Sequence, residues 1–269
     1  TCDLSLSIAA RRIFVGFCFL KKFKHSTPMK FISFLILISL IGAHAAKPKP
    51  PAGFVALFNG KNLDGWWGLK TEDPAKWMAL SPEKLAAKKK ASLEDVKKHW
   101  SVEDGVLVND GSGLYLSTEK NYGNFEFQVD YKTVAKADSG IYLRGVPQVQ
   151  IWDYTKEAGK WKLGADKGSG GLWNNGGAGA PGRDPLVLAD KPFGQWNAFH
   201  ITMVEDIVTV LLNGKLVVDK APLNNFWDRG TPVAKRKPLI KKGPIQLQTH
   251  GGEIRWRNVY LKELTPSSD

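Results

Sequence analysis

The strict alternation of apolar and polar side chains in residues 124–133, NFEFQVDYKT, constrains the fold of this chain more than any other feature. Successive side chains of a strand point to opposite faces, so the four alternate apolar residues from Phe125 to Tyr131 would share one buried face. A helix would scatter the same residues around its axis. The segment therefore predicts a long strand with one face on a core.

Further short alternating segments follow, separated by turn signals. They are WSVEDGVLVND, SGIYLRG, PQVQIWD, AFHITMVEDIVTVLLNGKLVVD and the closing VYLKEL. Asn213-Gly214 is the strongest hairpin signal, because this dipeptide readily takes the positive φ angles of a tight turn, and Asp104-Gly105 is a second. Many short strands with one clear helical segment favour an all-β fold, an antiparallel β-sandwich or jelly roll.

The helical segment is SPEKLAAKKKASLEDVKKHW, residues 81–100. Ser81 suits a helix N-cap and Pro82 the first helical position, and the spacing of the leucines and Val96 is loosely amphipathic. We expect one short helical insertion at the surface that covers one edge of the core.

The first 45 residues predict export. From Met29, MKFISFLILISLIGAHA has a basic start, an apolar run and a small-x-small ending, which describe a secretory signal cleaved after Ala45. We expect residues 1–28 to be an upstream extension, although a leader with two apolar blocks is an alternative. The apolar run is short for a membrane span, so we predict a secreted or periplasmic protein with no stable membrane anchor after cleavage.

The rest of the chain is expected to be a Pro/Lys linker at 46–52, a single β-sandwich domain at 53–264 and a tail at 265–269. Cleavage after Ala45 would remove Cys2, Cys18, six basic residues and one acidic residue, so the formal net charge would fall from +12 to +7. The remaining lysine runs are typical of a solvated face, and we expect no nucleic-acid partner.

Residues 156–195 interrupt the strand rhythm with a Gly-rich stretch that also carries Trp161 and Trp173. Long loops inside compact domains are usually functional or disordered. The two tryptophans favour an ordered loop that lies over a site.

Polar side chains follow one face of three predicted strands. In GPIQLQTHGGEIRWRN, residues 243–258, two aliphatic residues alternate with Gln246, Gln248 and His250. The same alternation of side chains in SGIYLRG and PQVQIWD adds further residues to this polar face. They are Tyr142, Arg144, Gln148, Gln150 and Trp152, with Asp153 and Glu253 at the rim.

This face predicts a carbohydrate ligand. The alternative interpretation is a solvated sheet face, but Lys, Glu and Thr are commoner than amides on such a face. A sugar ring packs its C–H face on an aromatic ring while amides and guanidinium groups bind its hydroxyls. Other chemistries fit less well, because the sequence has no Gly-x-Ser-x-Gly elbow, CxxC, HExxH, Walker loop or EF-hand spacing.

Six ordered segments resemble one known family. FNGKNLDGW, WSVEDGVL, ADSGIYLRG, QVQIWD, WNAFHITMVEDIVTVLLNG and GPIQLQTHGGEIRWRN are similar to the 3-keto-disaccharide hydrolase domain, once named domain of unknown function 1080. The resemblance covers nearly all of residues 53–264. It implies a concanavalin-like jelly-roll sandwich with a ligand face, and an exported enzyme that acts on sugars oxidised to a ketone at C3.

The resemblance also implies a mechanism in which a base removes the proton on C2, the C1 aglycone is eliminated and water is added. Under it, His250 or Asp153 would be base and acid, and Arg144 would stabilise the enolate. Gln148, Gln150, Gln248, Tyr142 and Glu253 would bind the oxidised sugar, and Trp152 would stack on a ring. The resemblance assigns no definite cofactor, and a divalent metal held by His250, Asp153 and Glu253 is an open alternative that would assist the enolate.

Two departures from the family leave alternatives open. Relatives carry Glu where this chain has Gln148 and an acid where it has Thr249, so a different base, a different sugar or binding without turnover would each fit. A non-catalytic, lectin-like carbohydrate-binding module needs only the aromatic and amide face. A retaining glycanase needs two close carboxylates, and the Gln148-x-Gln150-x-x-Asp153 pattern disfavours it.

Overall fold

The structure is a computed structural model that describes residues 49–265. The predicted upstream extension and signal peptide, the start of the linker and the end of the tail lie outside the described residues. Within residues 49–265, no helix has both the length and the apolar character needed to cross a membrane.

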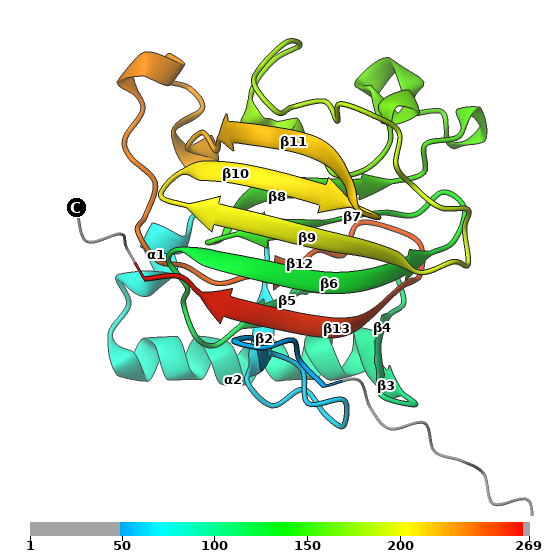
Figure 1. Cartoon of the computed structure of the whole chain (residues 1–269). Coiled ribbons are helices and arrows are strands. Elements are labelled where there is room, and N and C mark those ends of the chain that lie inside the picture. Colours follow the sequence, from blue (N-terminus) through cyan, green and yellow to red (C-terminus); the bar gives the residue numbers. More distant parts are fainter. Residues whose placement is uncertain (1–48, 266–269) are drawn as a thin grey trace, which may run out of the picture. The chain divides into compact units, whose positions relative to one another are not determined.

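Two antiparallel sheets form the domain (Figure 1). The larger has the order β11-β10-β9-β6-β13-β4-β3, with β1 beside β13, and the smaller has the order β2-β5-β12-β7-β8. The strands are β1 Val55–Ala56, β2 Trp66–Leu69, β3 Trp100–Glu103, β4 Val106–Asn109, β5 Tyr115–Thr118, β6 Phe125–Thr133, β7 Asp138–Leu143, β8 Val146–Trp152, β9 Asn197–Val204, β10 Ile207–Leu212, β11 Lys215–Pro222, β12 Gln246–Leu247 and β13 Ile254–Glu263. The predicted jelly-roll sandwich of antiparallel strands is confirmed.

The core lies between the two sheets. In β6, every second residue from Phe125 to Thr133 is buried, as the alternation predicted. Ile141 of β7 and Val149 of β8 are also fully buried and belong to the same cluster. Since the apolar residues of the smaller sheet point inward, their polar neighbours in sequence lie on its outer face.

Several hairpins turn through residues with positive φ. Asn213 has φ 52° between β10 and β11, and Asp104 has φ 50° between β3 and β4, so both predicted turns are confirmed. The β7–β8 turn is made by Arg144 and Gly145, with φ 53° and 73°. A two-residue turn of this kind matches the twist of its strands, although the left-handed region is unfavourable for an arginine.

The predicted helix is α2, Pro82–His99, and a shorter helix, α1 Pro74–Met78, precedes it. The Ser81 side chain accepts a hydrogen bond from Lys84 N at 3.4 Å, as expected of an N-cap. Ser92 Oγ accepts from Gly68 N of β2 at 2.9 Å, and Val96 joins the core. Because α2 contacts β2 and β3, the end strands of the two sheets, it covers an edge of the sandwich as expected.

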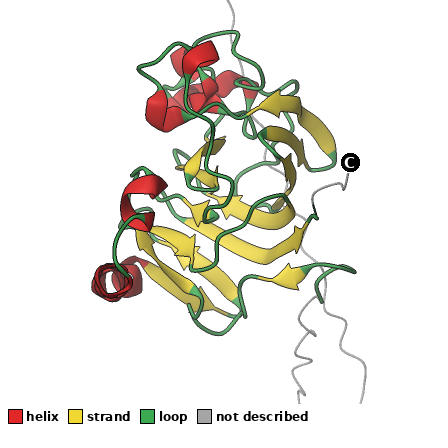
Figure 2. Ribbon diagram, turned by 90° about the vertical axis from the view of Figure 1, so that its left-hand side faces the viewer, coloured by secondary structure: helices red, strands yellow, loops and turns green. Residues whose placement is uncertain are grey.

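The Gly-rich segment is ordered into four 3₁₀ turns between β8 and β9. They are η1 Lys156–Ala158, η2 Trp161–Leu163, η3 Ala165–Lys167 and η4 Trp173–Asn175. Two more 3₁₀ turns follow β11: η5 Phe226–Asp228 and η6 Val233–Lys235. The turns between β8 and β9 gather near the top of both views (Figures 1 and 2). Ser169 Oγ accepts from Trp152 N at 3.2 Å, and Asp190 accepts from Ser169 N at 2.8 Å, so the segment is tied to the end of β8.

Candidate functional site

A pocket of about 350 Å³ lies on the outer face of the smaller sheet. Side chains of β5, β7 and β8 line it, together with residues from the loops before and after them. The lining residues are Thr71, Tyr115, Asp138, Tyr142, Gln148, Gln150, Trp152, Lys160, Leu163, Trp173, Asn174, Phe226, Gln248 and His250.

Strand parity explains the floor of the pocket. Asp138, Gly140 and Tyr142 alternate with core residues along β7, and Gln150 is the β8 partner of Gly140. A Cβ atom at Gly140 would lie 3.0 Å from Gln248 Oε1 and 2.9 Å from the Val149 carbonyl oxygen. The missing side chain therefore leaves the space into which the glutamines reach.

Three ionisable side chains meet at one end of the floor. His250 Nδ1 lies 3.2 Å from Asp138 Oδ2, and Lys160 Nζ donates to the same oxygen. The hydrogen bond with Asp138 raises the pKa of His250. Burial alone would raise the pKa of Asp138, but hydrogen bonds from His250 and Lys160 outweigh it and hold that pKa below its ordinary value. Asp138 is thus an anion between two cation-forming groups.

The backbone brings His250 to this position. Strand β12 ends at Leu247, but Gln248 N still donates to Gly140 O at 2.9 Å. Asp138 N donates in turn to Gly251 O at 2.8 Å. The segment after β12 therefore continues along β7, and the imidazole arrives beside the first residue of that strand.

The glutamines form a hydrogen-bond network on the floor. Gln148 Nε2 donates to Gln150 Oε1, and Gln150 Nε2 donates to Asp138 Oδ1 at 2.8 Å. Gln248 Nε2 donates to the Tyr115 hydroxyl at 3.4 Å, while its buried Oε1 has no hydrogen-bond partner among the described residues. An unpaired buried acceptor is costly, so Gln248 Oε1 can take a donor from a ligand.

Hydroxyl groups occupy the side of the pocket next to β5. The Thr71 hydroxyl lies 2.7 Å from the Tyr115 hydroxyl and 3.3 Å from the Tyr142 hydroxyl. Burial raises the pKa of Tyr142 far above its ordinary value. The Tyr142 phenol therefore stays neutral and can donate a hydrogen bond at any physiological pH.

Six of the predicted site residues come together in this pocket. They are Tyr142, Gln148, Gln150, Trp152, Gln248 and His250. Three others do not line it: Arg144, Asp153 and Glu253.

The predicted position of Arg144 is wrong, because β7 ends at Leu143 and the turn removes Arg144 from the strand alternation. Its guanidinium is 1% exposed and donates to Asp206 Oδ1 at 2.8 Å and to the carbonyl oxygens of Glu205 and Lys241. It lines a different hollow, together with Glu205 and Lys241.

The predicted rim positions of Asp153 and Glu253 are also wrong. The buried Asp153 carboxylate accepts from Lys136 N and Thr155 N, each at 2.7 Å, which fixes the turns at the end of β8. Glu253 is partly exposed and pairs with Arg255 at 2.6 Å. The metal ligands considered, His250, Asp153 and Glu253, form no cluster; in residues 49–265, no three His, Cys, Asp or Glu side chains lie together as a metal site would require.

Asp138 and Lys160 were missed by the sequence analysis. Asp138 shares the strand parity of Tyr142, so extending the alternation of SGIYLRG back by one residue would have found it. Lys160 lies in the Gly-rich segment. The sequence predicted that this segment forms an ordered loop that lies over a site, but it did not single out Lys160. That segment also supplies Leu163, Trp173 and Asn174, so the expectation is confirmed.

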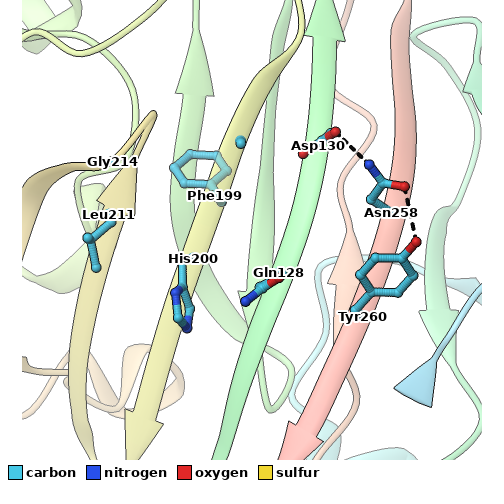
Figure 3. Close-up of a pocket in the computed structure, with 9 residues that line it drawn as sticks. Gln128, Asp130, Phe199, His200, Leu211, Gly214, Asn258 and Tyr260 are labelled. Atoms are coloured by element: carbon cyan, nitrogen blue, oxygen red, sulfur yellow. Dashed lines mark hydrogen bonds between the residues drawn. The ribbon is translucent and has the colours of Figure 1, made fainter. Parts of the chain in front are cut away.

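A second hollow, of about 300 Å³, lies on the outer face of the larger sheet (Figure 3). Its polar groups largely bind one another: Asn258 Nδ2 donates to Asp130 Oδ2 at 2.8 Å, and the Tyr260 hydroxyl donates to Asn258 Oδ1 at 3.1 Å. His200 pairs with Glu126 at 3.1 Å. The first pocket combines an ion triad with an unpaired buried acceptor, so we take it as the candidate site.

Comparison with known proteins supports the fold. The chain is 24% identical to the 3-keto-disaccharide hydrolase of Bacteroides thetaiotaomicron over 254 residues, which cover 81% of this chain and 80% of that protein. Two crystal structures of candidate glycosyl hydrolases from Parabacteroides distasonis superpose with TM-scores of 0.53 and 0.50, at 22% and 25% identity. The first superposition covers 82% of this chain and 94% of the crystallised chain. The second covers 78% of this chain and 99% of the crystallised chain.

The match to a family model is more direct evidence of family than the similarity to these single proteins. Residues 53–262 match the model of the 3-keto-alpha-glucoside-1,2-lyase-like domain. The chain belongs to the 3-keto-alpha-glucoside-1,2-lyase-like family.

Proposed function

We propose that this chain cleaves 3-keto-glycosides by elimination and hydration. A base takes the proton from C2, the electron pair of that bond moves through the enolate to form the C1–C2 double bond, and the C1–O bond breaks with its pair going to the aglycone oxygen, which takes up the proton from the base. Water then adds its hydroxyl to C1 and its proton to C2. The observation that carries the proposal is the His250–Asp138 pair beside Lys160 in an amide-lined pocket.

His250 is the base in this proposal. Asp138 accepts the Nδ1 proton, which orients the imidazole and leaves Nε2 free to take the C2 proton. The same hydrogen bond raises the pKa of His250, so neutral His250 is a stronger base than a free imidazole. A C3 ketone makes the C2 proton acidic enough for such a base.

Lys160 stabilises the enolate oxygen in place of Arg144. Among the described lining residues, it is the one side chain that carries a permanent positive charge. A preorganised cation beside developing negative charge lowers the barrier. Gln248, Tyr115 and Tyr142 supply hydrogen bonds for the sugar hydroxyls on the remaining sides.

The departures from the family pattern fit this assignment. Thr249, where relatives carry an acid, donates its hydroxyl to Gly113 O at 2.6 Å and does not line the pocket. With Gln148 in place of an acid, Asp138 is the single carboxylate among the described lining residues. A retaining glycanase needs two, about 5–5.5 Å apart, so elimination fits this pocket better.

Export to a periplasmic or extracellular location, where such sugars would be met, is part of the proposal and rests on the segment from Met29 to Ala45. The function is tested by the release of a chromogenic aglycone from a 3-keto-glucoside and from the same glucoside without the ketone. We expect turnover of the keto substrate alone. Turnover of neither substrate, with retained binding of the sugar, would favour the lectin-like alternative.

A further inference from the structure

The two sides of the candidate pocket differ in chemistry. Ionisable groups, amides and hydroxyls occupy the floor and the side next to β5. The opposite side, next to β8, is lined by the apolar side chains of Trp152, Leu163, Trp173 and Phe226. These come from the end of β8 and from η2, η4 and η5, of which η4 and η5 pack against β8.

The hydrogen-bonding atoms on this apolar side are already used within the protein. Trp152 Nε1 donates to Gly168 O at 2.8 Å, and Trp173 Nε1 donates to Leu163 O at 3.0 Å. The Trp152 and Trp173 rings meet edge to face, with centroids 5.9 Å apart. A ligand therefore meets ring and methyl carbons here, with the Asn174 amide as the polar neighbour.

Part of this apolar surface is left open to water. Leu163 is 46% exposed although it lines a pocket, and it lies on a short 3₁₀ turn held by the Trp173 indole. Burial of such a side chain by a ligand is favourable in proportion to the apolar area covered. A second sugar could pack its C–H face on this surface, but its hydroxyl groups would find few partners on this side, and such groups are costly when unpaired.

We propose that the leaving group of the substrate is an aromatic or arylalkyl alcohol, which packs against Leu163, Trp173 and Phe226 while the 3-keto sugar lies over Gly140. The inference rests on the proposed function and names its substrate class. The enzyme would thus act on 3-keto-glycosides of apolar alcohols in preference to 3-keto-disaccharides.

The test compares kcat/KM for a benzyl 3-keto-glucoside with that for a 3-keto-disaccharide of the same anomeric configuration. A sugar hydroxyl is the more acidic leaving group, so intrinsic reactivity favours the disaccharide, and a preference for the benzyl substrate must come from binding. We expect the benzyl substrate to be favoured by about tenfold or more, the scale of discrimination that hydrophobic pockets provide.

Leu163→Ser is expected to reduce the ratio of the two kcat/KM values at least about fivefold. The matched control is Leu186→Ser, because Leu186 is also an exposed leucine, at 62%, but does not line the pocket. That variant should leave the ratio unchanged.

The outcomes separate the two proposals. Equal or greater kcat/KM for the disaccharide, or equal losses for both substrates in Leu163→Ser, would overturn the leaving-group inference while the proposed function stands. Turnover of neither substrate by the wild type would overturn the proposed function and the inference with it.

Discussion

His250 Nδ1 and Asp138 Oδ2 lie 3.2 Å apart, although the two residues are more than a hundred positions apart in the sequence. Asp138 is 8% exposed at the start of β7, whereas the His250 side chain is 59% exposed at the mouth of the pocket. A buried carboxylate that holds an accessible imidazole is an arrangement suited to general base catalysis. The remaining groups in the pocket are interpreted around this pair.

The pH dependence of catalysis should follow His250. Only the neutral imidazole accepts a proton, so kcat/KM is expected to rise with pH through the raised pKa of His250 and then level off. Asp138→Asn removes the first cause of that raised pKa, so the inflection should move to lower pH and the plateau should fall by about 10²-fold or more.

A pH–rate profile of both proteins between about pH 5 and 9 checks this expectation. Asp110→Asn is the matched control, because Asp110 pairs with His99 at 2.9 Å and neither residue lines the pocket. An inflection at the same pH in the wild type and in Asp138→Asn would contradict the role of the pair.

Arg144 is expected to matter for stability and not for chemistry. Arg144→Ala breaks a buried ion pair with Asp206 and leaves two backbone carbonyls without a donor. Because Asp206 is partly exposed and can be hydrated, we expect the free energy of unfolding to fall by about 2–3 kcal/mol. Chemical denaturation measures this change, and kcat/KM of the folded protein should stay within about twofold.

Lys242→Ala is the control for Arg144, because Lys242 lines the same hollow but is exposed. It should change neither stability nor turnover. A large loss of kcat/KM in fully folded Arg144→Ala would restore the catalytic role that the sequence predicted.

Gly140→Ala should narrow the pocket. The new Cβ would meet Gln248 Oε1 at 3.0 Å and the Val149 carbonyl oxygen at 2.9 Å, so the Gln248 side chain must move from the floor. We expect kcat/KM to fall about tenfold or more, with a loss of stability of about 1–3 kcal/mol. Gly230→Ala is the control, since nothing lies within 4 Å of a Cβ there. Unchanged kinetics in Gly140→Ala would place the sugar elsewhere.

Helix α2 should owe part of its docking to Ser92. Its hydroxyl accepts from Gly68 N on the end strand β2 and donates to Lys89 O at 2.7 Å. Ser92→Ala leaves the buried Gly68 N–H unpaired, so the free energy of unfolding should fall by about 1–3 kcal/mol, as measured by thermal or chemical denaturation. The exposed Ser101→Ala serves as control. An equal, small effect in both variants would show that the hydroxyl is dispensable.

The sandwich could be predicted because strand alternation and turn chemistry are local. The alternation from Phe125 to Tyr131 identifies the buried face of β6, and Asn213-Gly214 specifies the turn between β10 and β11. The same rule failed at Arg144, because parity counts are valid only within a strand and the strand ends one residue earlier. His250 lies beyond its strand as well, and it reaches the pocket through backbone hydrogen bonds that parity does not predict.

Lys160 shows what sequence patterns cannot supply. Its position depends on how the segment with η1 and η2 folds back towards the start of β7, which is set by tertiary contacts such as the pairing with Asp138. The two tryptophans of the Gly-rich segment indicated an ordered loop, but composition does not specify which side chain of a loop enters a site. The polar face of a strand is thus readable from the sequence, whereas the loop residues that complete the pocket are not.

The most direct test of the account is cleavage of a 3-keto-glucoside in D₂O, with the C2 position of the product followed by NMR from the first turnovers. Elimination predicts that each released 3-keto sugar carries deuterium at C2 and that His250→Gln slows aglycone release and deuterium incorporation together. A parallel incubation of the product with the enzyme corrects for exchange after release. Aglycone release with the original C2 hydrogen retained would contradict the mechanism.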